Sequence, residues 1–158
     1  MKKKTGVVIG RFQPFHYGHA WLINKALTEF EDVVILIGST NVEDENNPWS
    51  YKSRKKMLEE FIRRNKIEKK VLKLDKIEDV PDDNKWLEVA LQKIKTENFT
   101  VIGDNEWVNG IFESKGYKIL RIGFFQRELY EGLKIRKLYN ANENWQERIP
   151  KYIVKLLE

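Results

Sequence analysis

The sequence contains no cysteine, and it has only two methionines, four prolines and two histidines. Without cysteine the chain can form neither a disulfide framework nor a thiolate metal site, which fits a reducing compartment. No apolar run approaches the roughly 20 residues of a membrane span. The run GVVIG at residues 6–10, behind the basic start, is too short for a signal peptide. We therefore expect a cytoplasmic protein that has no membrane partner.

The remaining composition is that of a folded globular chain. Hydrophobic residues make up 41% of the 158 residues, which is enough to bury a core. We expect one domain over residues 1–158, in which C-terminal helices at about 132–158 take part. The 29 basic and 24 acidic residues leave a net charge of +5, which suits either nucleic acid or small anionic substrates. The densest basic stretch, residues 63–73, has no interleaved aromatic residue, so we expect a solvated face and no nucleic-acid partner.

Apolar runs and helical patterns alternate along the chain. Continuous runs rich in β-branched residues predict strands at residues 5–10, 33–38, 70–75, 99–104 and 117–122. Helical periodicity predicts helices at residues 19–30, 51–65, 86–95, 105–115 and 132–139 and after Pro150. This alternation predicts an α/β fold with a doubly wound, mostly parallel five-stranded sheet and a C-terminal helical segment. In such sheets, ligands bind at the carboxyl ends of the strands.

The stretch GRFQPFHYGH, residues 10–19, contains both histidines at the turn from the first strand to the first helix. Gly18 permits the close approach of a phosphate, and the helix N-terminus supplies amide donors. Imidazoles donate hydrogen bonds to phosphate oxygens without needing a full charge. A zinc site would lack cysteine and a third histidine, and the P-loop and GxGxxG patterns are absent. The stretch therefore predicts a phosphate-binding turn.

GRFQPFHYGH closely resembles the first motif of the nucleotidylyltransferase superfamily, GxFxPxHxGH, and most of all that of the archaeal-type nicotinamide-nucleotide adenylyltransferases. Further segments resemble the same family: GST at residues 38–40, NPWSYKSR at 47–54, DDNKW at 82–86, IGDNEWV at 102–108 and RELYEGLKIR at 127–136. The resemblance implies a Rossmann-like nucleotidylyltransferase fold. It also implies adenylyl transfer from ATP to nicotinamide mononucleotide, which gives NAD and pyrophosphate.

The resemblance implies a role for each matching residue. The catalytic residues would be His16, His19, Arg11 and Arg136. The ATP-binding residues would be Gly10, Phe12, Gly18, Gly132 and Lys134. The acceptor-binding residues would be Ser39, Arg54, Trp86, Asp104 and Asn105. Mg²⁺ is expected with ATP, carried by phosphate oxygens and water without a dedicated protein ligand, and the family implies a homo-oligomer.

Several of these assignments have structural alternatives. Trp86 either stacks on a cationic pyridinium ring or belongs to the core. Asp104 and Asn105 either bind the acceptor or cap a helix. Arg54 lies on a predicted helix rich in lysine and arginine, where a solvated face is the default.

The last segment departs from the family at two positions. Where the family has hydroxyl residues, this chain has Glu131 and Leu133, and a carboxylate beside a phosphate is repulsive. Two alternatives therefore stay open. One is a sister transferase, such as a cytidylyltransferase or a phosphopantetheine adenylyltransferase, and the other is a nucleotide-binding regulator without turnover. The sequence does not distinguish nicotinamide from nicotinate mononucleotide.

Overall fold

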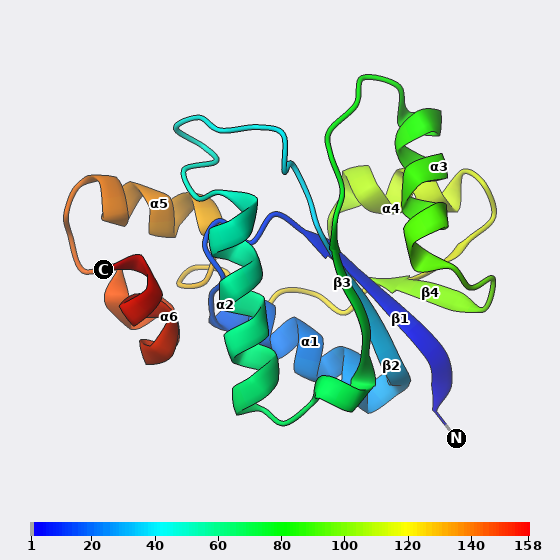
Figure 1. Cartoon of the computed structure of the whole chain (residues 1–158), viewed down its shortest axis with the longest axis horizontal. Helices are drawn as coiled ribbons and strands as arrows, with labels where there is room; N and C mark the ends of the chain where they lie inside the picture. The colour runs from blue at the N-terminus through cyan, green and yellow to red at the C-terminus, as the bar shows by residue number, and fades with distance from the viewer. Residues whose placement is uncertain (1) are drawn as a thin grey trace.

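The computed structural model describes residues 2–158 and contains a five-stranded sheet in which all paired strands are parallel (Figure 1). The strands are β1 (Lys3–Gly10), β2 (Phe30–Ile37), β3 (Val71–Lys76), β4 (Phe99–Ile102) and β5 (Lys118–Leu120). Their order in the sheet is β3-β2-β1-β4-β5. The predicted α/β class with a parallel five-stranded sheet is confirmed.

The helices lie at the positions that the periodicity predicts. They are α1 (Tyr17–Glu29), α2 (Tyr51–Arg64), α3 (Asp83–Ile94), α4 (Glu106–Glu113), α5 (Gly132–Asn140) and α6 (Lys151–Leu157), with short 3₁₀ turns at Glu68–Lys70 and Gln146–Arg148. Within residues 2–158, no helix has the length and apolar character needed to cross a membrane.

The helix boundaries differ from the prediction by a few residues, and packing explains the difference at the end of α1. The helical pattern includes Phe30, but α1 ends at Glu29 and Phe30 is the first residue of β2. The Phe30 ring is fully buried against Gly6, where an added Cβ would lie 2.8 Å from the ring. The ring therefore fills the space that the missing side chain of Gly6 leaves, and this packing outweighs the local helical pattern.

The side chains of the central strands divide the core into two clusters. Along β2, Val33 and Ile35 belong to one cluster, whereas Val34 and Leu36 belong to the other. Successive residues of a strand point to opposite faces, so a strand covered on both faces needs an unbroken apolar run. The run VVILI has this composition because both faces of β2 are buried.

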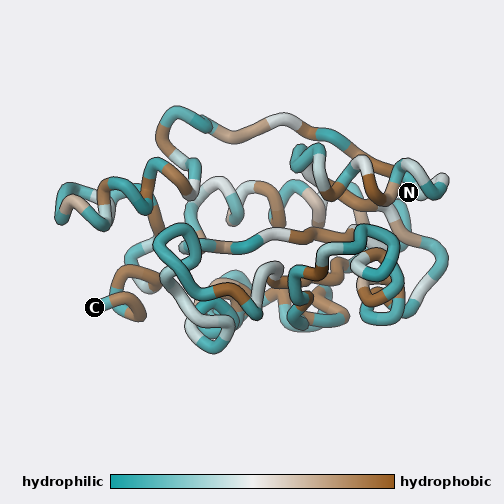
Figure 2. Tube along the Cα trace, turned by 90° about the horizontal axis from the view of Figure 1, so that it is seen from above, coloured by the Kyte–Doolittle hydropathy of each residue, from teal (hydrophilic) through white to brown (hydrophobic). Residues whose placement is uncertain are grey.

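Different helices cover the two faces. The first face packs against α1, α2, α5 and α6, and the second packs against α3 and α4. Figure 1 shows α3 and α4 on one side of the sheet and α2, α5 and α6 on the other. In Figure 2 brown and teal alternate along the helices, as expected for helices with one face on the core. Ile149 and Ile153 from the C-terminal segment share a cluster with Met57 and Phe61 of α2.

The strand order places a crevice at the carboxyl ends of β1 and β4. These two strands are neighbours, but the chain leaves β1 into α1 on the first face and leaves β4 into α4 on the second. The two connections diverge above the sheet, which is the arrangement in which open parallel sheets bind their ligands.

A substitution in α6 tests the packing of the C-terminal segment. Ile153 is fully buried, so Ile153→Ala should lower the free energy of unfolding by about 2–5 kcal/mol. Leu156 on the same helix is 45% exposed, and Leu156→Ala is the matched control that should cost about 1 kcal/mol or less. Urea denaturation measures both, and equal losses would contradict the packing described.

Candidate active site

A cavity of about 310 Å³ opens in the crevice between β1 and β4. Its wall is formed by the ends of these strands, the loop from β1 into α1, the segment from β5 to α5 and the start of α5. The wall includes ten of the residues predicted for the site: Gly10, Arg11, Phe12, His16, Gly18, His19, Asp104, Asn105, Gly132 and Arg136. The cavity thus gathers residues from the first and the last part of the chain.

The two histidines cap α1 through a reciprocal pair of hydrogen bonds. The Nδ1 atom of His16 accepts from the backbone N–H of Gly18 at 3.0 Å, and the Nδ1 atom of His19 accepts from the backbone N–H of His16 at 3.2 Å. This is the capping-box arrangement, with imidazoles in place of the usual hydroxyl and carboxylate. Because each Nδ1 accepts a hydrogen bond, a neutral ring carries its proton on Nε2. Both Nε2–H groups are then available as donors.

Burial keeps both rings neutral. The pKa of His16 is lowered from 6.5 to about 3, first by burial and second by the charge of Arg136. Burial, followed by the effect of His16, also holds the pKa of His19 well below 6.5. The ring centroids lie 3.7 Å apart with the planes 25° from parallel, a contact that two charged rings would resist. The pair therefore offers two neutral N–H donors.

The local sequence explains how this turn is built. A Cβ on Gly18 would lie 2.8 Å from Cε1 and 2.9 Å from Nδ1 of His16, so a side chain there would displace the imidazole. Phe12 has a φ of +54°, in the left-handed region, and its buried ring lies 4.6 Å from that of His19. This conformation costs about 1 kcal/mol or more for a residue with a side chain. The buried contact with His19 offsets this cost.

Arg136 and Gln13 tie the turn to other parts of the fold. Nη1 of Arg136, on α5, donates to the carbonyl oxygen of Gln13 at 2.8 Å. The Gln13 side chain exchanges two hydrogen bonds with the backbone of Trp49, each at 3.0 Å. Burial and the neighbouring Arg11 lower the pKa of Arg136. Its buried Nε has no hydrogen-bond partner among the described residues, and the residue itself lines the cavity.

Arg54 lies outside the cavity wall, and its expected position on a solvated face is wrong. The side chain is fully buried and donates to the carbonyl oxygens of Arg11 at 2.8 Å and Gly38 at 2.7 Å. Burial lowers its pKa to about 10. Ser39 also lies outside the cavity, where its hydroxyl donates to Asp79 at 3.0 Å. The structure thus uses Arg54 to join the ends of β1 and β2, and contact of Arg54 or Ser39 with the acceptor stays a prediction.

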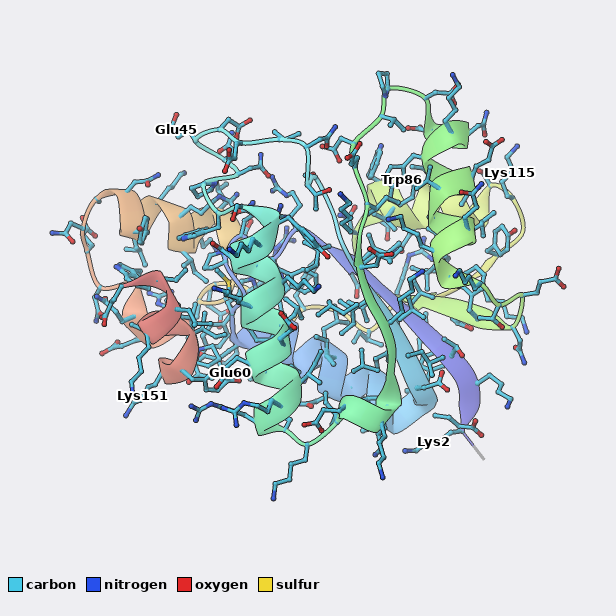
Figure 3. The ribbon with its side chains drawn as sticks, in the orientation of Figure 1. Lys2, Glu45, Glu60, Trp86, Lys115 and Lys151 are labelled. Atoms are coloured by element: carbon cyan, nitrogen blue, oxygen red, sulfur yellow. The ribbon has the colours of Figure 1, made fainter. Side chains whose placement is uncertain are left out.

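Trp86 also lies away from the cavity. Its side chain, on α3 (Figure 3), is 2% exposed and packs edge-to-face on Trp107 at 5.1 Å and on Phe112 at 6.0 Å, both on α4. A ring that is covered in this way presents no free face to a pyridinium. The structure therefore matches the core alternative, and the stacking role stays a prediction that would need the indole to be uncovered.

Asp104 and Asn105 do line the cavity, and both also make local hydrogen bonds. The Oδ1 atom of Asn105 accepts from the backbone N–H groups of Trp107 and Val108, which caps α4. One carboxylate oxygen of Asp104 accepts from the backbone N–H of Ile122 at 3.0 Å. Capping and substrate contact are compatible here, because each side chain has further polar atoms at the cavity.

The start of α5 combines basic residues with one carboxylate. Lys134 lies outside the cavity wall, with Nζ 3.3 Å from Oε2 of Glu131. Arg127 pairs with the other oxygen of the same carboxylate at 3.8 Å. Glu131 and Leu133, the two departures from the family motif, both line the cavity.

The aromatic side of the cavity is not predicted by the sequence analysis. Trp21, Phe125 and Tyr130 stack in a row, with centroids 5.7 Å apart at each step and planes 16° and 7° from parallel. All three line the cavity, together with Phe124 and the buried Asn109. The signal was the pair of phenylalanines at residues 124–125 in a predicted loop. Trp21 resembled an ordinary core residue because it shares the helical spacing of its apolar neighbours.

Within residues 2–158, no group of three or more His, Cys, Asp or Glu side chains is placed to hold a metal ion.

The protonation of the two histidines can be measured directly. We expect ¹⁵N NMR at pH 7 and at pH 5 to show both rings neutral, with the proton on Nε2 and Nδ1 unprotonated, since burial lowers both pKa values. In urea both rings should titrate near 6.5. As the pH falls, His16 is protonated in the unfolded state before it is protonated in the folded state. The free energy of unfolding should therefore decrease between about pH 6.5 and about pH 3, and above pH 6.5 it should not depend on His16. A charged ring at pH 6 in the folded protein would contradict the assigned hydrogen bonds.

Substitution of Trp86 separates the core position from the stacking role. Trp86→Ala should lower the free energy of unfolding by about 3–5 kcal/mol, as for a buried tryptophan. Trp107→Ala is the control from the same ring pair, and its smaller loss follows from an exposed fraction of 51%. Thermal or urea unfolding reports both. Full stability of Trp86→Ala, with a raised KM for the acceptor, would favour stacking instead.

Comparison with known proteins places this site in a family. The cytidylyltransferase-like family matches residues 7–154. The nicotinamide-nucleotide adenylyltransferase of Saccharolobus solfataricus is 30% identical over 96% of this chain and 88% of its own, and that of Methanocorpusculum labreanum is 32% identical over 98% and 90%. The crystal structure of a bifunctional NMN adenylyltransferase/ADP ribose pyrophosphatase from Francisella tularensis superposes with a TM-score of 0.79 at 25% identity, over 93% of this chain and 45% of that one. This chain belongs to the cytidylyltransferase-like family, among the archaeal nicotinamide-nucleotide adenylyltransferases.

Proposed function

We propose that this protein transfers the adenylyl group of ATP to nicotinamide mononucleotide, which gives NAD and pyrophosphate. The observation that carries the proposal is the pair of neutral, stacked imidazoles at the start of α1, on a cavity wall that also holds Arg11 and Arg136. Within residues 2–158, no hydrogen-bond partner takes up their Nε2–H groups. The names of the relatives support the same reaction.

The site suits a reaction that needs charge stabilisation more than proton transfer. An oxygen of the mononucleotide phosphate attacks the α-phosphorus of ATP, a P–O bond forms, and the bond to pyrophosphate breaks. The nucleophile is already an anion, so no general base is required. His16 and His19 would donate hydrogen bonds to the phosphate oxygens, and Arg11 and Arg136 would balance the charge that develops on the five-coordinate phosphorus and the leaving group.

The rest of the cavity suits a nucleoside. The row of Trp21, Phe125 and Tyr130 gives one wall the apolar character that a base or a pyridine ring requires. Asp104 and Asn105 supply polar atoms at the end of β4, where a ribose or a carboxamide needs hydrogen-bond partners. These features support a dinucleotide-sized reaction complex in the crevice between β1 and β4.

Mg²⁺ is expected to enter with ATP. The carboxylates on the cavity wall, Asp104 and Glu131, are oxygen donors of the kind that Mg²⁺ prefers. Both already have partners in the chain, Asp104 on a backbone N–H and Glu131 on basic side chains. A magnesium ion held mainly by phosphate oxygens and water therefore fits this wall. When bound, it would supply neutralisation of the triphosphate charge.

The remaining expectations form part of the same proposal. We propose one domain over residues 1–158, which is supported by the shared core cluster of Ile153 with α2. We further propose a cytoplasmic enzyme, since the chain has no cysteine, and a homo-oligomer, since the family resemblance implies one. The proposed small-molecule partners are ATP and nicotinamide mononucleotide.

Turnover of the purified protein tests the reaction. Pyrophosphate release with ATP and nicotinamide mononucleotide should fall about 10²–10³-fold in His19→Ala, because one donor to the transferring phosphoryl group is removed. Asn24→Ala, an exposed position on the same helix, is the control and should keep full activity. Melting curves should show that both variants fold. An unchanged rate in folded His19→Ala would remove this residue from the site.

The same assay separates the alternatives when the substrates are varied. The alternative acceptors are nicotinate mononucleotide and phosphopantetheine, and the alternative nucleotide is CTP. Pyrophosphate release only with these would favour a sister transferase. Binding of ATP by calorimetry without pyrophosphate release from any combination would favour a regulator.

A further inference from the structure

Glu131 is a carboxylate on the wall of an otherwise basic end of the cavity. The residues of that end include Arg11, Arg127 and Arg136, and Lys134 lies next to it. Glu131 is the residue before α5, the N-cap position, yet its side chain makes no capping hydrogen bond. Local helix geometry therefore does not account for this carboxylate.

The carboxylate instead pairs with two cations. Oε2 lies 3.3 Å from Nζ of Lys134, and Oε1 lies 3.8 Å from Nη2 of Arg127. Lys134 also donates to the carbonyl oxygen of Arg127 at 3.4 Å, which closes a small polar cluster. Side chains of this cluster are 29–55% exposed, so water and a ligand can reach them. Without a ligand, Glu131 thus neutralises part of the positive charge of Lys134 and Arg127.

The position next to Glu131 brings the cluster close to the buried arginine. A Cβ on Gly132 would lie 2.7 Å from Nη1 of Arg136, so glycine is required there for Arg136 to approach the start of α5. The charge of Glu131 also acts on Arg136, where it partly opposes the lowering of the pKa by burial, so a phosphate bound by Arg136 would be exposed to the same charge. A bound phosphate and the Glu131 carboxylate would repel each other unless one of them moves or is screened.

Resting on the proposed function, we infer that Glu131 sets the affinity for the nucleotide by occupying, on Lys134 and Arg127, the place of a distal phosphate. ATP must displace the carboxylate to gain these two cations. A nucleotide with a single phosphate reaches neither cation, so its binding does not require displacement of the carboxylate. Glu131 is accordingly a residue that tunes affinity for the polyphosphate and takes no part in the bond-making step.

Equilibrium binding tests the inference without turnover. Glu131→Gln keeps the size of the side chain and removes its charge, so the dissociation constant for ATP should fall about three- to tenfold. The dissociation constant for AMP should stay the same. Glu128→Gln removes the same charge from an exposed position three residues earlier and should change neither constant. Titration calorimetry of the full chain, with and without Mg²⁺, measures all of these.

The outcomes separate this inference from the proposed reaction. An unchanged ATP constant in Glu131→Gln, or equal tightening in Glu128→Gln, would overturn the inference alone. Weaker binding of ATP with Mg²⁺ would also overturn it, since the carboxylate would then assist binding. If the unsubstituted protein bound no ATP, the proposed function would fail together with the inference. Glu131→Ser provides a second uncharged variant, with the same expected direction, in case Glu131→Gln folds poorly.

Discussion

The backbone carbonyl groups of the loop between β1 and α1 need hydrogen-bond donors. The geometry of the candidate active site depends on which side chains donate to them. Phe12, Gln13, Phe15 and His16 of this loop are buried, so water has little access to its backbone. Arg54 donates to the carbonyl of Arg11, and Arg136 donates to that of Gln13. One arginine comes from α2 and the other from α5. The loop is therefore held between two helices that are distant in sequence, and the histidines that follow it are held with it.

The two imidazoles also satisfy backbone groups that would otherwise lack hydrogen-bond partners. Their Nδ1 atoms satisfy backbone N–H groups at the start of α1, which a helix must cap in some way. Capping by imidazole leaves the other nitrogen of each ring as a donor, on residues that line the cavity. Burial lowers the pKa values and so keeps the donors neutral. A structural requirement of the helix thus fixes the tautomer of both rings, the one that the proposed reaction would use. The positive charge beside them belongs to the arginines, which stay protonated even where burial lowers their pKa.

The loop between β2 and α2 shows how charge is distributed outside the site. Glu45 lies at the outer part of this loop and points away from the body of the protein (Figure 3). Asn47, closer to the cavity, accepts a hydrogen bond from Arg11 at 3.2 Å and donates one to Asp44 at 3.0 Å. Asn47 thus links Arg11 to the acidic loop, so the position of Arg11 at the cavity mouth depends on residues of both loops.

The sequence by itself determined the features that depend on neighbours along the chain. The unbroken apolar run of β2 predicted a strand buried on both faces, and the HYGH stretch predicted a helix start with phosphate-binding character, because periodicity and capping are local. Tertiary structure decided what depends on packing between distant segments. It buried Arg54 against the backbone carbonyls of the residues that follow β1 and β2, placed Trp86 in the core and brought Phe125 against Trp21. It also joined Arg136 to a carbonyl 123 residues away. No local pattern encodes such contacts, because the energy of a buried side chain depends on which partners the fold brings to it.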